Sequence, residues 1–171
     1  MWLTRNRRDL MPSLTPSQQF VFDQGEVVGK LAQQLYPGGI DARPASPSNY
    51  QPALKLTQQL IAEGRQVIYE AAFQFDGVLS ALDILVMKED GYYGYEIKST
   101  TSIHDINITD AAMQYWVMKN CGVELKDISI IHINKEYERE GEIELQKLFK
   151  TESVYYLVLA LQDEIAESVN A

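Results

Sequence analysis

The stretch that decides the fold spans residues 80–100 and reads Ser-Ala-Leu-Asp-Ile-Leu-Val-Met-Lys-Glu-Asp-Gly-Tyr-Tyr-Gly-Tyr-Glu-Ile-Lys-Ser-Thr. Its β-branched and aromatic residues predict two strands joined by a tight turn. Because strand side chains alternate between the two faces of a sheet, Glu96 and Lys98 share one face and Ile97 points to the other, into apolar packing. The second strand therefore presents an acid and a lysine on the same side.

The register of this hairpin decides whether Asp83, on the first strand, joins them. The Asp-Gly pair at 90–91 is a strong signal for a two-residue type I′ turn. A turn centred there places Asp83 opposite Lys98, on the face that carries Glu96. A four-residue loop over 88–91 shifts the pairing by two residues and keeps the same face, whereas a three-residue loop turns the aspartate to the opposite side.

Two carboxylates and a lysine on one face have a specific chemical use. The carboxylates offer hard oxygen ligands to Mg²⁺ or Mn²⁺, and such an ion lowers the pKa of its water and stabilises charge on a phosphodiester. Lys98 is placed to orient or activate the attacking water and to offset charge in the transition state. An ordinary cross-strand ion pair between Asp83 and Lys98, with Glu96 as a surface acid, is the alternative, and spacing alone favours it.

Further residues change that weighting. Glu70 precedes Asp83, Glu96 and Lys98 in the chain, and a helix carrying Gln114 follows them. This order of residues resembles the PD-(D/E)XK nuclease superfamily. The resemblance is greatest to the RecB-like branch, which includes the CRISPR-associated exonucleases. From about Trp2 to the C-terminal helix, the chain is also similar to an uncharacterised bacterial family of that branch. The stretches that carry this similarity are 22–29, 69–73, 83–85, 96–100 and 131–134.

The resemblance assigns roles to the hairpin residues. It implies that Asp83 and Glu96 bind Mg²⁺ or Mn²⁺, that the carbonyl of Ile97 is a third metal ligand, and that Lys98 is the catalytic lysine. It also implies a restriction-endonuclease-like fold.

Two assignments outside the hairpin are weaker. Glu70, on the preceding strand, is implied as a further metal ligand, and a partly exposed strand glutamate is an equally good interpretation. Gln114 matches a helical glutamine that contacts the site in this branch, although the tyrosine usual four residues later is Met118 here.

Two further departures bear on the expected cofactors. The branch often carries a histidine where this chain has Gly29, so one metal contact is missing. Relatives with an iron–sulfur cluster use four cysteines, whereas this chain has only Cys121, so we expect no such cluster. We expect Cys121, at the end of an apolar helix, to be a small buried hydrophobe.

Composition predicts one globular domain over 1–171, with residues 1–15 as a loosely ordered basic segment; 46% of the residues are hydrophobic and 23% charged. The single cysteine favours a reducing cytoplasm, and we expect no membrane partner because the apolar stretches are only strand-sized. The net charge of −9 argues against a nucleic-acid enzyme. Much of the acid comes late in the chain, however, and several basic residues lie near the first helix: Arg5, Arg7, Arg8 and Lys30.

Periodicity and turn signals predict the remaining elements. We expect an α/β fold with a mixed β-sheet of about four strands flanked by helices, including a parallel strand–helix–strand crossover. The expected helices lie at 15–36, 52–63, 105–121, 144–149 and 153–168, the expected strands at 66–75, 79–88, 92–99 and 128–133, and a loop at 37–51.

The sequence thus leads to a metal-dependent nuclease that hydrolyses phosphodiester bonds, with DNA as the expected polymer. The alternative is a catalytically inactive nuclease-like module that serves as a nucleic-acid-binding or assembly subunit, and a purely structural α/β protein is the third possibility. The acidic composition leads us to expect weak autonomous binding or delivery to the substrate by a partner protein or a missing domain.

Overall fold

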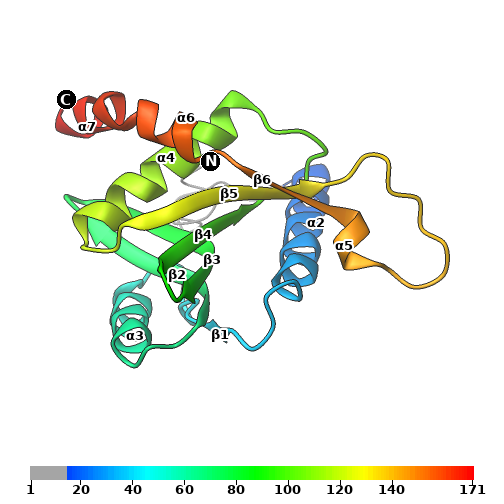
Figure 1. The fold of residues 1–171 in the computed structure, drawn as a ribbon, viewed down its shortest axis with the longest axis horizontal. Coiled ribbons are helices and arrows are strands. Elements are labelled where there is room, and N and C mark those ends of the chain that lie inside the picture. Colours follow the sequence, from blue (N-terminus) through cyan, green and yellow to red (C-terminus); the bar gives the residue numbers. More distant parts are fainter. Residues whose placement is uncertain (1–14) are drawn as a thin grey trace.

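The computed structural model describes residues 15–171, and the basic segment expected at the N-terminus lies, except for residue 15, outside these described residues (Figure 1). A six-stranded sheet in the order β1-β2-β3-β4-β5-β6 forms the centre of the molecule. The helices are α2 (Pro16–Gln33), α3 (Gln51–Ala62), α4 (Asp105–Asn120), α5 (Leu145–Leu148), α6 (Tyr155–Ala160) and α7 (Gln162–Asn170). The strands are β1 (Ile40–Asp41), β2 (Val67–Phe75), β3 (Val78–Lys88), β4 (Gly91–Ile97), β5 (Leu125–Ile133) and β6 (Phe149–Ser153).

The sheet is mixed. Strands β2, β3 and β4 form an antiparallel meander, and β4 pairs in parallel with β5 after a crossover through α4. The edge strand β1 is parallel to β2, and the other edge strand, β6, is antiparallel to β5. The predicted parallel strand–helix–strand unit is confirmed.

Helices cover both faces of this sheet, and each face has its own apolar core. The larger core joins the sheet to α3, α4, α6 and α7, and the smaller joins the other face to α2 and α5. Figure 1 shows α4 and α6 along one side of the sheet and α2 on the other. The α/β prediction is therefore confirmed.

The prediction of about four strands is wrong, because two short edge strands were missed. Strand β1 has only two residues and lies in the stretch predicted as a loop. Strand β6 buries only Phe149 and exposes its other four residues, so it lacks the apolar alternation of a strand. The helix predicted at 153–168 is two helices, α6 and α7, which meet at Leu161.

The β3–β4 hairpin follows the second of the predicted registers. Leu85 pairs with Gly94, which is the pairing of the four-residue loop, so the pairing predicted from a turn centred on the Asp-Gly pair is wrong by two residues. Side-chain contacts favour the observed turn: the Tyr93 hydroxyl donates to Asp90 Oδ2 at 2.7 Å, and the Lys88 ammonium lies 4.0 Å from the centroid of the Tyr93 ring. A shift of two residues keeps every side chain on its face.

Within residues 15–171, every helix is too short or too polar to cross a membrane.

Candidate functional site

The site lies where β3 and β4 part. Their last paired residues are Ile84 and Tyr95. Beyond this pair, the carboxylate of Asp83 takes the place of a backbone acceptor, because the Ile97 N–H donates to Asp83 Oδ2 at 2.7 Å. Since the N–H and C=O of one extended residue point towards the same neighbouring strand, the Ile97 carbonyl also faces this gap. Asp83 is only 4% exposed, so its charge is held in the protein interior.

Glu96 is the most deeply buried acid of the site, with no exposed surface. Its Oε1 accepts from Lys98 Nζ at 3.2 Å, and its Oε2 accepts from Gln114 Nε2 at 2.8 Å. The other end of the Gln114 amide accepts from the Ser80 hydroxyl at 3.4 Å, which fixes the orientation of the amide. A buried carboxylate is tolerated only when it is paired and hydrogen-bonded, and both oxygens of Glu96 meet that requirement.

A third acid, Asp110, completes the cluster from helix α4. Lys98 Nζ lies 3.3 Å from Asp110 Oδ2 as well as 3.2 Å from Glu96, so the ammonium bridges the sheet and the helix. Asp110 precedes Gln114 by four residues, and positions four apart lie on one face of a helix. Asp110 was not among the predicted site residues, although its spacing from Gln114 is a signal that identifies it.

We call Asp83, Glu96, Lys98 and Asp110 the polar cluster. Its three carboxylates and one ammonium leave a formal charge of −2, which suits a divalent cation. Across residues 15–171, no group of three or more His, Cys, Asp or Glu side chains is arranged to hold a metal. Proteins commonly hold Mg²⁺ through one or two carboxylates, with waters and substrate phosphates as its other ligands.

Glu70 points elsewhere. Glu70 and Asp83 are opposite each other in the register of β2 and β3, but the ladder has no pair at this position. Glu70 has a backbone φ of 54°, a strained value for a residue with a side chain. Its carboxylate lies 3.2 Å from the guanidinium of Arg43, which also approaches Glu26 of α2 at 3.6 Å. The structure thus joins Glu96 to Lys98 and Gln114 and holds Asp83 on the backbone N–H of Ile97, between Glu96 and Lys98 in the chain. It directs the Glu70 side chain towards Arg43 instead.

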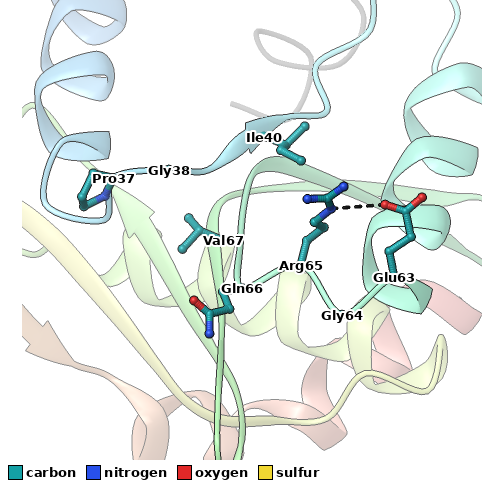
Figure 2. A pocket seen from close by; sticks show the side chains of 8 residues that line it. All are labelled: Pro37, Gly38, Ile40, Glu63, Gly64, Arg65, Gln66 and Val67. Carbon is teal, nitrogen blue, oxygen red and sulfur yellow. Dashed lines mark hydrogen bonds and ion pairs between the residues drawn. The ribbon is translucent and has the colours of Figure 1, made fainter.

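Two hollows of the described surface bear on the site. The larger, of about 660 Å³, lies between the loop after α2, the end of α3 and the start of β2, and Figure 2 shows its lining with the Arg65–Glu63 ion pair. The residues of the polar cluster are not part of that lining. The smaller hollow, of about 450 Å³, is lined by residues of α2 together with Ser99 and Ile133. Because Ser99 directly follows Lys98, this hollow adjoins the end of β4, although no residue of the polar cluster lines it.

The single cysteine lies apart from the polar cluster. Cys121 is exposed, so the prediction of a buried hydrophobe is wrong; the helix ends at Asn120 and leaves the thiol at the surface. Its Sγ lies 3.4 Å from the carbonyl oxygen of Gln74. Partial burial raises the pKa of the Cys121 thiol, which makes it a poor nucleophile at neutral pH.

No protein-family model matches this sequence, and no curated protein matches it at a significant level. The functional interpretation of the polar cluster rests on its geometry and on the motif resemblance.

Proposed function

We propose that this protein is a nuclease that hydrolyses phosphodiester bonds, with DNA as its polymer, Mg²⁺ or Mn²⁺ as its cofactor and the reducing cytoplasm as its setting. The observation that carries the proposal is the bond of Asp83 to the N–H of Ile97, whose neighbours in the chain, Glu96 and Lys98, are themselves paired where the two strands part. A mixed sheet with helices on both faces and a parallel crossover through α4 agrees with the restriction-endonuclease-like fold that we propose.

Each residue has a role in the proposed reaction. Asp83 and Glu96 provide carboxylate oxygens, and the Ile97 carbonyl, which faces the same gap, provides a third ligand. Gln114 holds the Glu96 carboxylate in place through its bond to Oε2. A metal ion bound there would lower the pKa of a water molecule and offset charge on the phosphate. Lys98, 15% exposed, can hold that water or a phosphate oxygen at Nζ.

Glu70 has a lesser part in the proposal. Its carboxylate pairs with Arg43, so serving as a metal ligand would require Glu70 to exchange this partner for the metal. We therefore place the two-carboxylate set of Asp83 and Glu96 first and treat Glu70 as an auxiliary ligand.

One observation favours the second candidate, a nuclease-like module without turnover. Glu96 has no exposed surface and both of its oxygens accept hydrogen bonds within the protein. A satisfied buried network of this kind can also serve to specify the fold.

The test combines metal binding with cleavage. Mn²⁺ is titrated into the protein and followed by thermal shift and calorimetry, with Asp83→Asn as the site variant and the exposed Asp163→Asn as its control. Cleavage is measured on labelled linear and circular, single- and double-stranded DNA and RNA. Lys98→Met removes the ammonium, and Lys119→Met, at the exposed end of α4, is the matched lysine control.

We expect Mn²⁺ to stabilise the unsubstituted protein and both controls but not Asp83→Asn. We expect cleavage to disappear in Asp83→Asn and in Lys98→Met and to persist in both controls. Loss of one charged ligand typically costs tenfold or more in metal affinity. Binding of Mn²⁺ without cleavage of any substrate would favour the inactive module. Absence of Mn²⁺ binding would refute the metal site.

A further inference from the structure

Asp110 is the one acid of the polar cluster that the proposed reaction does not use. It lies on α4, its side chain is 33% exposed, and its Oδ2 is 3.3 Å from Lys98 Nζ. Lys98 therefore contacts two carboxylates, the fully buried one of Glu96 on β4 and the partly exposed one of Asp110 on α4.

The second carboxylate matters because Glu96 pairs with Lys98 in the structure and is also a proposed metal ligand. In the structure, its Oε1 accepts from Lys98. Under the proposed function, the same carboxylate has to turn to a dication, and an ammonium left beside that dication would be repelled and would lose its bond to Glu96. A largely buried ammonium that loses its partner is strongly destabilised. Asp110 supplies a second carboxylate that already contacts the ammonium.

We infer that Asp110 is a positioning residue for Lys98, an inference that rests on the proposed function. When Lys98 gives up its bond to Glu96, Asp110 keeps the ammonium paired and holds it at the mouth of the gap between β3 and β4. The lysine then stays within reach of the scissile phosphate.

The inference predicts that removing the charge of Asp110 weakens metal binding. In Asp110→Asn, Lys98 retains Glu96 as its charged partner in the cluster and competes more strongly with the metal for that carboxylate. We expect the Kd for Mn²⁺ to rise roughly three- to tenfold, as for the loss of one partly buried ion pair. We expect kcat on a labelled DNA substrate to fall while KM changes little, because the lysine is misplaced and the substrate contacts are kept.

Three further variants isolate the role of Lys98. Asp110→Glu keeps the charge and should restore most of the Mn²⁺ affinity. Asp105→Asn makes the same charge change in the first turn of the same helix, at an exposed residue, and should leave Mn²⁺ affinity and cleavage unchanged. In a Lys98→Met background, Asp110→Asn should change the Kd by less than about twofold, because neighbouring residues couple only when both are present.

The outcomes separate this inference from the proposed function. If the unsubstituted protein binds no Mn²⁺, the proposed function fails and the inference fails with it. If the unsubstituted protein binds Mn²⁺ and Asp110→Asn binds it equally well, the inference alone is overturned. An equal loss in Asp105→Asn, or an undiminished effect of Asp110→Asn without Lys98, would also overturn it, since the effect would then be one of general charge.

Discussion

Asp83 offers a test of the site architecture that needs no metal and no substrate. Its carboxylate closes the gap between β3 and β4 by accepting the Ile97 N–H at 2.7 Å, in a position only 4% exposed. Asp83→Ala removes the acceptor, whereas Asp83→Asn keeps an oxygen of nearly the same shape and removes only the charge. The two variants therefore separate the hydrogen bond from the electrostatics.

The magnitude follows from the two contributions. In Asp83→Ala, the buried Ile97 N–H loses its acceptor, at a cost of about 1–3 kcal/mol. In Asp83→Asn, a charged acceptor becomes a neutral one, and the loss of about 1 kcal/mol is offset by reduced repulsion among the acids around Lys98. We expect Asp83→Ala to lower the free energy of unfolding by about 2 kcal/mol, or roughly 4–8 °C in Tm, and Asp83→Asn to lie within about 1 kcal/mol of the unsubstituted protein.

The assay is equilibrium unfolding in urea at neutral pH with a chelator present, followed by tryptophan fluorescence, because Trp116 is 9% exposed and reports on the core. The slope of unfolding free energy against urea should be the same for all three proteins. Hydrogen exchange at the Ile97 amide should be faster in the alanine variant than in the asparagine variant. Equal stability of the two variants would refute the structural role given to the Asp83 carboxylate.

Two other predictions concern β4. The pKa of Asp90 is lowered from its ordinary value of 3.8 because its carboxylate accepts from the Tyr93 hydroxyl. The stabilisation from this hydrogen bond is therefore present above about pH 4 and is lost as the pH falls through the lowered pKa. Tyr93→Phe, which keeps the ring, should thus lower Tm slightly at pH 6 and not at all near pH 2, and a difference that persists in acid would contradict this. Gly94→Ala should lower the free energy of unfolding in urea by about 1–3 kcal/mol, because the added carbon would lie 2.8 Å from a leucine methyl. Gly25→Ala in α2, where no atom lies within 4 Å of the added carbon, should raise that free energy by about 0.5–1 kcal/mol. Equal effects of the two substitutions would contradict the packing described for Gly94.

The sequence by itself determined which face each residue of β4 occupies. Alternation has a period of two, so Glu96 and Lys98 share a face whatever the rest of the chain does. In β3 the alternation breaks at Asp83, because Leu82 and Leu85 pack in the larger core and Ile84 and Val86 in the smaller one, so the register alone does not fix the face of Asp83. Local periodicity also predicted the four central strands and the crossover helix α4.

Tertiary structure alone decided which partners these side chains meet. The contact of Asp110 with Lys98 depends on how α4 lies across the sheet, and the turn of Glu70 towards Arg43 depends on a strained backbone at one position. The edge strands β1 and β6 exist because neighbouring strands offer them hydrogen bonds, since neither carries enough apolar alternation of its own. Long-range packing fixes distances between elements, and a sequence pattern, which is local, carries no information about those distances.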